Sequence, residues 1–86
     1  MDKDILIKKL LYRSNYRGCK ETDFLVGNFA KANLDKVDDL NLYAEFLDER
    51  DGDIYDWIME KTKSPLKYKH LVQNIKNFHN INSYSQ

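Results

Sequence analysis

The residue types most able to do chemistry lie in one short stretch, Arg17-Gly18-x-x-Glu21, which also contains a thiol. One helical pattern runs into this stretch and another runs out, so the motif falls at a corner between two helices. Glycine is the usual residue just past a helix end because it enters the left-handed region without a Cβ penalty. A glutamate in the first turn of the next helix is favoured by that helix's positive end. From these residues alone, a well-capped turn is a simpler interpretation than a binding site.

The remaining reactive side chains do not form a catalytic or metal site. Cys19 is the only cysteine, and no histidine lies near it in the sequence to act as its base. His70 and His79 are too far apart to share one helix face, and a single thiol cannot build a disulfide or a thiolate cage. We therefore expect no catalytic residue and no metal ion, and we expect a binding protein rather than an enzyme.

Length and charge restrict the class of protein further. The 86 residues carry 14 bases and 14 acids, so the strongly basic footprint of a nucleic-acid binder is missing. The chain is long enough for one domain, which we assign to residues 1–79, with a frayed tail at 80–86. The charge is divided, however, since residues 35–56 carry a net charge of −7. This acidic block is either a solvated face or a docking surface.

The beginning of the sequence bears on its compartment. Met1-Asp2-Lys3-Asp4 is acidic from its second residue, unlike a signal peptide or an Arg-rich transit peptide. No apolar run approaches the length needed to span a bilayer, so we expect no membrane insertion. We expect a monomer in a bacterial cytoplasm. A trimmed mature form in the mitochondrial matrix would have a similar sequence.

Hydrophobic periodicity predicts two helices around the corner. The first runs from Asp4 to Asn15 or Tyr16 and repeats apolar or small residues on one face at Ile7, Leu10, Leu11 and Ser14. The second starts between Lys20 and Thr22, and we expect it to stop at Asn33 in the left-handed conformation. Its inward stripe is predicted to contain Leu25, Phe29 and Ala32, with Phe24 and Val26 beside it. Gly27 lies inside this helix, which predicts a close approach of a neighbouring backbone.

Three shorter helices are predicted downstream. Asp35 and Asp38 resemble a capping box for a third helix, whose inward face is Leu40, Tyr43, Ala44 and Leu47. Asp51 or Asp53 can cap a fourth helix, with Ile54, Trp57 and Ile58 facing inward and Asp56 and Glu60 outward. Ser64 and Pro65 are suited to begin a fifth helix, which buries Tyr68, Leu71, Val72 and Ile75, with Phe78 one turn on. With no segment of period two, we predict an all-α fold, a small antiparallel bundle of five short helices.

Four segments between about residues 6 and 65 form a longer pattern. In order they are Leu10-Leu11-Tyr12-Arg13-Ser14-x-x-Arg17-Gly18-x-x-Glu21, Phe29-Ala30, Leu40-x-Leu42-Tyr43 and Asp51-x-Asp53-Ile54-Tyr55-x-Trp57. Together they are similar to the succinate dehydrogenase assembly factor family. Its members are small bacterial and mitochondrial proteins that promote covalent attachment of FAD to the flavoprotein subunit of complex II.

The resemblance implies five helices and a partner, the succinate dehydrogenase flavoprotein subunit, with the fumarate reductase flavoprotein as a second candidate. FAD is then the cofactor of the partner, and this chain holds no cofactor stably. The histidine that bonds to the flavin belongs to the partner, so neither His70 nor His79 takes that role.

Carried over by position, the resemblance also implies a site. Its centre is Arg17, Gly18 and Glu21, and its secondary candidates are Tyr12, Arg13, Asp53, Tyr55 and Trp57. We expect Arg17 and Glu21 to donate and accept hydrogen bonds with the flavoprotein, while Gly18 allows close backbone approach. The alternative from another class is a small helical interaction module that regulates a different enzyme.

Overall fold

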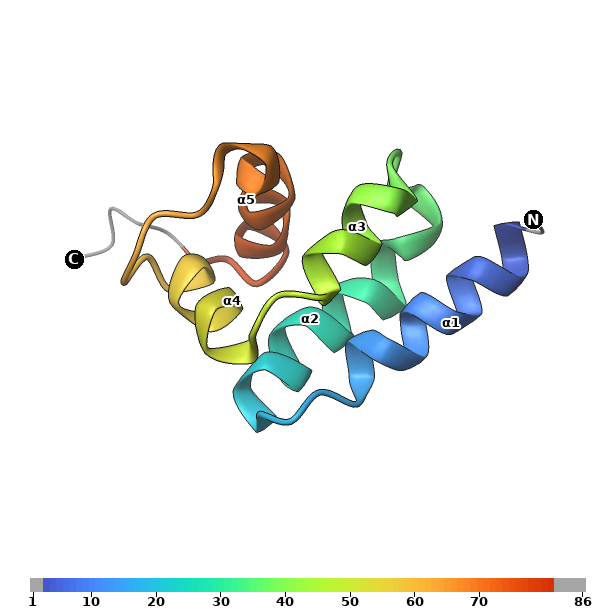
Figure 1. The fold of residues 1–86 in the computed structure, drawn as a ribbon, viewed down its shortest axis with the longest axis horizontal. Helices are drawn as coiled ribbons and strands as arrows, with labels where there is room; N and C mark the ends of the chain where they lie inside the picture. The colour runs from blue at the N-terminus through green and yellow to red at the C-terminus, as the bar shows by residue number, and fades with distance from the viewer. Residues whose placement is uncertain (1–2, 82–86) are drawn as a thin grey trace.

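The computed structural model describes residues 3–81. Over this range the chain forms α1 (Lys3–Asn15), α2 (Lys20–Asn33), α3 (Leu40–Leu47), α4 (Asp51–Ile58) and α5 (Lys69–Phe78), with short 3₁₀ turns η1 (Leu34–Lys36) and η2 (Leu66–Tyr68) (Figure 1). No strand is present among the described residues. The predicted all-α bundle of five short helices is confirmed.

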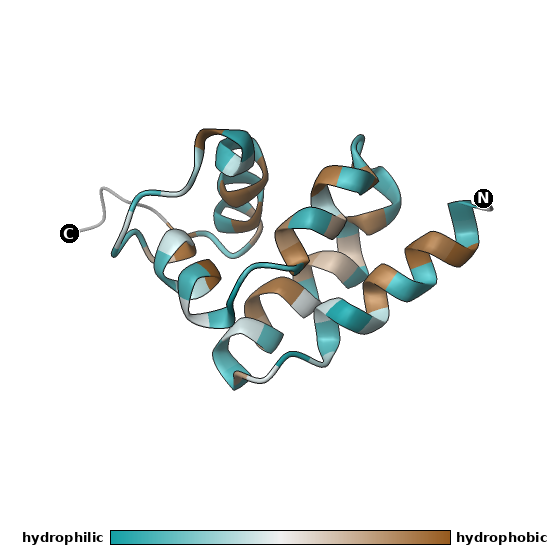
Figure 2. Ribbon diagram, in the orientation of Figure 1, coloured by the Kyte–Doolittle hydropathy of each residue, from teal (hydrophilic) through white to brown (hydrophobic). Residues whose placement is uncertain are grey.

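The helices form an elongated bundle with principal extents of 43 × 25 × 21 Å. α1 and α2 lie antiparallel, α3 packs beside them, and α4 and α5 form the other end of the molecule (Figure 1). Each helix carries hydrophobic residues on one side and hydrophilic residues on the other (Figure 2). This pattern is the physical reason for the fold, because five short amphipathic helices can bury their apolar sides only against one another.

Aromatic side chains fill the centre of the bundle. Phe46 lies 5.3 Å from Tyr68 and 6.2 Å from Trp57, measured between ring centroids, and all three are buried. The two core tyrosine hydroxyls are both paired. Tyr43 donates to Ser14 Oγ at 2.6 Å, since the Ser14 hydroxyl proton is given to the Leu10 carbonyl. Tyr68 donates to the Glu49 carboxylate at 2.8 Å.

The seam between α1 and α2 explains the glycine inside α2. A Cβ built on Gly27 would lie 2.6 Å from Asn15 Oδ1 and 3.2 Å from the Ser14 carbonyl oxygen. The predicted close backbone approach at Gly27 is confirmed. Of the predicted α2 stripe, Leu25, Val26 and Phe29 are buried, but Ala32 and Phe24 are exposed. Ala30 takes the inward position expected of Ala32.

The predicted conformation of Asn33 and the predicted cap of α3 are wrong. α2 ends at Asn33 as predicted, but Asn33 has φ −131°, not a left-handed value, because the chain continues directly into η1. Asp35 is part of that turn and caps nothing. The N-cap of α3 is Asp39, whose carboxylate accepts from the Leu42 amide at 3.0 Å. The extra turn shifts the start of α3 beyond the predicted capping box.

The predicted starts of the next two helices are also wrong. Arg50, not Asp51 or Asp53, is the N-cap residue of α4, since the Asp51 carboxylate is occupied elsewhere. Pro65, not Ser64, precedes η2, and the regular helix α5 begins only at Lys69. Most residues predicted to face inward are nevertheless buried in α4, η2 and α5: Ile54, Trp57, Ile58, Tyr68, Leu71, Val72 and Ile75. Phe78, predicted one turn further on, is 40 % exposed. Hydrophobic periodicity therefore predicted the faces better than the caps.

α5 ends at Phe78, and the two residues that follow its C-cap His79 are also ordered by contacts with the rest of the chain. Asn80 adopts the left-handed conformation at φ 59°, and the Ile81 amide donates to the Lys76 carbonyl at 2.9 Å. Ile81 also packs against the core, so these two residues form a helix cap instead of the start of a frayed tail. Residues 82–86, the rest of the predicted tail, lie outside the described residues.

Candidate functional site

The carboxylate of Asp51 joins the corner between α1 and α2 to the start of α4 by hydrogen bonds. Asp51 Oδ1 accepts from Arg17 Nε, and Asp51 Oδ2 accepts from the Gly18 amide at 2.9 Å. A second nitrogen of the Arg17 guanidinium donates to the Glu49 carbonyl at 2.8 Å. We call this arrangement of Arg17, Gly18, Glu49 and Asp51 the corner clip. It joins the Arg-Gly motif to the α3–α4 turn.

The Arg17 side chain binds groups of its own chain. Its side chain is 9 % exposed, and that of Asp51 is 24 % exposed, so this is a largely desolvated ion pair. A charge in such a place is stable only when its hydrogen bonds are satisfied, as they are here. The predicted role of Arg17 as a direct partner contact does not fit this burial. Arg17 instead shapes the corner that other residues of the motif occupy.

Gly18 has a different reason for being glycine than the one predicted. No described glycine has a positive φ, so the corner does not need the left-handed conformation. A Cβ at Gly18 would lie 3.3 Å from Asp51 Oδ2, the atom that accepts from the Gly18 amide. The backbone of Gly18 is exposed and close to the carboxylate, and a side chain would press on the corner clip.

Further hydrogen bonds brace the corner from α2. The Arg17 amide donates to the Asp23 carboxylate, and the buried Thr22 hydroxyl donates to the Asp51 carbonyl at 3.3 Å. Arg13 pairs with Asp48 at 2.5 Å on the outside of the same contact. The end of α1, the start of α2 and the α3–α4 turn are thereby held in one arrangement.

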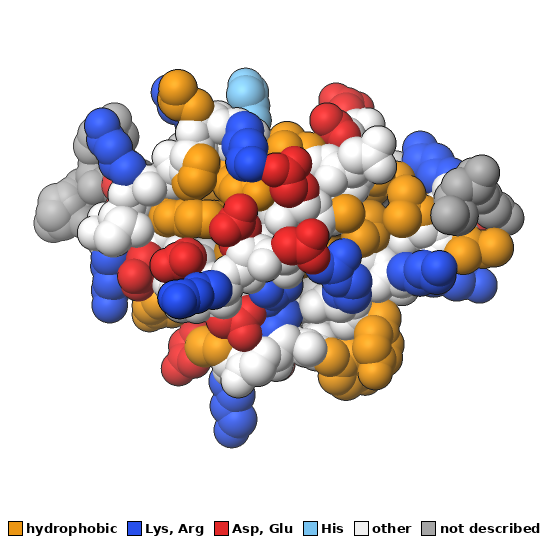
Figure 3. Space-filling view, in the orientation of Figure 1, with side chains coloured by type: hydrophobic (Ala, Val, Ile, Leu, Met, Phe, Trp, Pro, Cys, Tyr) orange, Lys and Arg blue, Asp and Glu red, His pale blue; other side chains and the backbone are white. Residues whose placement is uncertain are grey.

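The acidic block of residues 35–56 is neither only a solvated face nor a free docking surface. Four of its carboxylates bind side chains of other elements: Glu45 with Lys67, Asp48 with Arg13, Glu49 with Tyr68, and Asp51 with Arg17. Figure 3 shows acidic side chains gathered around the middle of one face with basic side chains next to them. Much of the acidic charge therefore serves to join helices.

Glu21 is the motif residue that faces solvent. Its carboxylate accepts from the Cys19 thiol at 3.1 Å. This hydrogen bond, aided by the Glu21 backbone amide, lowers the pKa of Glu21 below its ordinary value. No basic side chain forms an ion pair with it among residues 3–81. The corner thus presents a charged carboxylate without an ionic partner in the described part of the chain.

A shallow groove lies next to Glu21, between the first turns of α2 and the second half of α4. It has a volume of about 390 Å³ and is lined by Lys20, Glu21, Phe24, Leu25, Tyr55 and Met59. We call it the α2–α4 groove. Its lining is mainly apolar, with Phe24 61 % exposed and Met59 40 % exposed. It places Glu21 and Tyr55, two residues of the predicted site, on one surface.

The other secondary candidates are dispersed. Tyr12 and Tyr16 are exposed on α1 with ring centroids 4.5 Å apart, and Arg13 is paired with Asp48. Asp53 is exposed on α4. Trp57 belongs to the aromatic core and is 9 % exposed. The structure therefore brings Glu21 and Tyr55 together but separates them from Trp57 and from the tyrosine pair.

The residues singled out for reactivity stay apart. Cys19 is half-buried and its thiol donates to Glu21, while His79 Nε2 donates to the Leu25 carbonyl at 2.7 Å. Within residues 3–81 no group of three potential metal ligands comes together. In the same range no helix is both long enough and apolar enough to cross a membrane.

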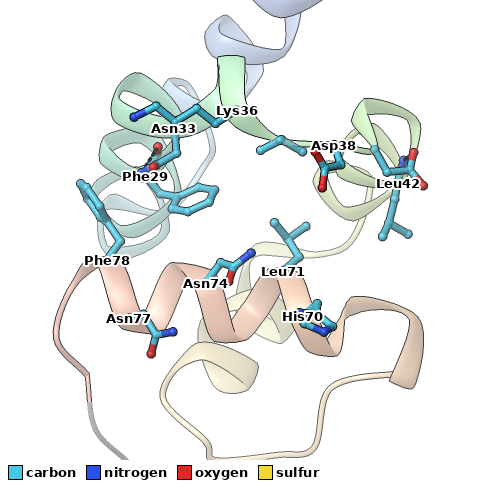
Figure 4. Close-up of a pocket in the computed structure, with 12 residues that line it drawn as sticks. Phe29, Asn33, Lys36, Asp38, Leu42, His70, Leu71, Asn74, Asn77 and Phe78 are labelled. Carbon is cyan, nitrogen blue, oxygen red and sulfur yellow. Dashed lines mark hydrogen bonds between the residues drawn. The ribbon is translucent and has the colours of Figure 1, made fainter.

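A larger hollow lies elsewhere, between η1, the start of α3 and α5 (Figure 4). It has a volume of about 690 Å³, with Phe29 and Leu71 among its apolar walls and Asn74 and His70 on α5 at its edge. No residue of the Arg-Gly motif reaches it. It is therefore separate from the corner.

Sequence reasoning missed three residues of this region. Asp51 was expected to cap a helix, but it holds Arg17 and Gly18. The periodicity predicts Phe24 beside the buried stripe and assigns no role to Met59. An aromatic residue one position off the Leu25–Phe29 stripe is a signal for an exposed apolar surface, and it could have been used for Phe24.

Comparison with known proteins identifies the family. The family model described as "Flavinator of succinate dehydrogenase" matches residues 8–79. Relatives named succinate dehydrogenase assembly factor 2, mitochondrial, are 42 % identical over 69 residues in Schizosaccharomyces pombe and 38 % identical over 76 residues in Dictyostelium discoideum. These matches cover 78 % and 86 % of this chain but 50 % and 54 % of the relatives, so the chain spans about half their length. The resemblance seen in the sequence is confirmed, and the chain belongs to the family of succinate dehydrogenase flavinators.

Proposed function

We propose that this protein binds the flavoprotein subunit of succinate dehydrogenase and promotes the covalent attachment of FAD to a histidine of that subunit. The observation that carries the proposal is the family match over residues 8–79, which includes the whole corner clip and Glu21. The word "flavinator" in the description of the family refers to flavin attachment. The choice of the flavoprotein subunit follows because FAD must be bonded to the protein that holds it.

The proposed role is that of an assembly factor without its own catalysis. Bond formation depends on the flavin and on the flavoprotein that positions it. A helper accelerates such a step by binding the competent conformation of its client more tightly than the others. Preferential binding requires a surface of fixed shape, and the corner clip supplies one by bracing α1, α2 and α4 together.

Within this proposal each residue of the corner has a separate role. Arg17 and Asp51 hold the corner, Gly18 lets the client approach the backbone, and Glu21 accepts hydrogen bonds from a donor on the client. FAD remains the cofactor of the client. The protein acts wherever the flavoprotein subunit matures, which for the relatives named above is the mitochondrion.

The test is the fluorescence of covalently bound flavin on the flavoprotein subunit, separated on a denaturing gel. Cells that lack this gene are compared with cells given the wild type, Glu21→Ala, Gly18→Arg or the matched control Asp35→Ala. Asp35 is also an exposed acid, and it lies in η1 away from the corner. We expect the signal to be lost in the deletion, restored by the wild type and Asp35→Ala, and restored poorly by Glu21→Ala and Gly18→Arg. A deletion strain with normal covalent flavin would contradict the proposal.

A further inference from the structure

We propose that the α2–α4 groove is the part of this surface that selects the client, by accepting an apolar side chain that lies next to a basic residue of the flavoprotein. The inference rests on the proposed function and adds which residues recognise the client and by what chemistry. It does not follow from the Arg-Gly motif, since Phe24 and Met59 lie outside it.

Part of the apolar lining of the α2–α4 groove is exposed to solvent. Phe24 and Met59 are both exposed large hydrophobic residues, and they lie on opposite sides of the same groove, on α2 and at the C-cap of α4. Tyr55 and the buried Leu25 complete the apolar lining. Apolar surface on two helices that converge on one hollow is typical of a site for a partner's side chain, whereas single exposed residues are ordinary.

The groove is held in shape before any partner binds. The His79 ring lies 5.5 Å from Phe24 between centroids, and its Nε2 bonds to the carbonyl of Leu25. His79 in turn packs edge-on to Phe78, which packs edge-on to the buried Phe29. Phe24 is therefore exposed on one side and supported from the core on the other. A preorganised aromatic side chain loses little conformational freedom on binding.

Charge identifies the occupant. Glu21 and Lys20 both line the groove. The pKa of Glu21 is lowered mainly by the Cys19 thiol and least by the charge of Lys20, and no ion pair joins Glu21 to a basic side chain in the described residues. A client that places apolar atoms against Phe24 brings its neighbouring groups beside this carboxylate. An arginine or lysine there forms a charge-assisted hydrogen bond with Glu21. The proposed occupant is therefore an apolar residue whose basic neighbour pairs with Glu21.

The apolar and charged contributions can be measured separately. The purified flavoprotein subunit is titrated with the wild type, Phe24→Ser, Glu21→Gln and the control Leu66→Ser, each at low and high salt. Leu66 is 86 % exposed on η2 and does not line the groove, so it controls for the loss of an exposed apolar side chain. Circular dichroism of each variant shows whether it is folded.

We expect Phe24→Ser to weaken binding by about tenfold or more at both salt concentrations, the order expected for one buried aromatic side chain. Glu21→Gln is expected to weaken binding at low salt and to reduce its dependence on salt, because it removes only the charge. Leu66→Ser should bind like the wild type. If folded Phe24→Ser binds as the wild type does, or if Leu66→Ser is weakened equally, the inference is wrong although the proposed function stands. If the wild type itself does not bind, the proposed function falls as well.

Discussion

The guanidinium of Arg17 and the carboxylate of Asp51 join two helix junctions that are 34 residues apart in the chain. The first lies between α1 and α2 and the second between α3 and α4. The contact turns a sequence motif that looks like a binding site into part of the framework. Losses of function at Arg17 and at Glu21 should therefore have different physical origins.

Arg17→Ala is predicted to destabilise the fold by about 3 kcal/mol, because it leaves the largely buried Asp51 carboxylate without its cation. Arg13→Ala, which breaks the exposed pair with Asp48, should cost less than about 1 kcal/mol. Urea unfolding followed by circular dichroism measures both. Equal losses for the two variants would contradict the assignment of Arg17 to the framework.

A double-mutant cycle gives a sharper test of the same pair. Arg17→Met combined with Asp51→Leu removes both charges together. We expect the double variant to be more stable than the sum of the single losses predicts, since neither charge is then left buried alone. Strict additivity would mean that the two groups do not interact.

The three glycines are predicted to differ in their response to alanine. Gly27→Ala should be the most destabilising, by about 1–3 kcal/mol, because its Cβ would clash with Asn15 and the Ser14 carbonyl. Gly52→Ala has nothing within 4 Å and should stabilise α4 by up to about 1 kcal/mol. Gly18→Ala, with one contact at 3.3 Å, should fall between them. Urea midpoints of the three variants test this order, and a Gly52→Ala as costly as Gly27→Ala would refute it.

Stability is predicted to fall at alkaline pH. Burial raises the pKa of Tyr43 to about 12, and burial together with the Glu49 carboxylate raises the pKa of Tyr68. In the unfolded chain both tyrosines ionise near pH 10. Above that pH the unfolded state releases protons that the folded state keeps, so the free energy of unfolding decreases from about pH 10 toward the folded pKa values. Below about pH 10 this contribution stays constant.

Unfolding free energies at about pH 8, 9, 10 and 11 check the alkaline decline. Tyr43→Phe should make it shallower, because it removes one of the two buried hydroxyls. Tyr12→Phe is the matched control, since Tyr12 is exposed and should leave the decline unchanged. A stability that does not vary between about pH 8 and 11 would show that neither tyrosine is protected as described.

Lys76 gives a further prediction. Its side chain is 8 % exposed and pairs with Glu60 just past the end of α4. Glu60→Gln should cost about 1–2 kcal/mol, reduced from the cost of a fully buried pair because Glu60 is 40 % exposed. Lys76→Met keeps the apolar stem without the charge and should be nearly neutral. Thermal unfolding measures both, and a larger loss for Lys76→Met than for Glu60→Gln would contradict this reasoning.

The fold class, the number of helices and most of the buried faces could be predicted from the sequence. Positions such as Leu10, Tyr43 and Ile75 follow from a period of 3.6, because each short helix must bury one apolar side. Helix caps were harder to predict, since several acids near each helix start can serve. The choice between Asp35 and Asp39, or between Arg50 and Asp51, depends on which side chains other helices engage.

The contacts of the motif residues depend on how separate helices pack, and they could not be predicted from the sequence. Arg17 and Asp51 are both charged and could both face solvent, and nothing local in the chain says that they meet. The same holds for Phe24 and Met59, which converge because α2 packs against α4. Spacing along one helix determines which residues share a face, whereas the packing of separate helices determines whether that face is core, framework or a surface free to bind.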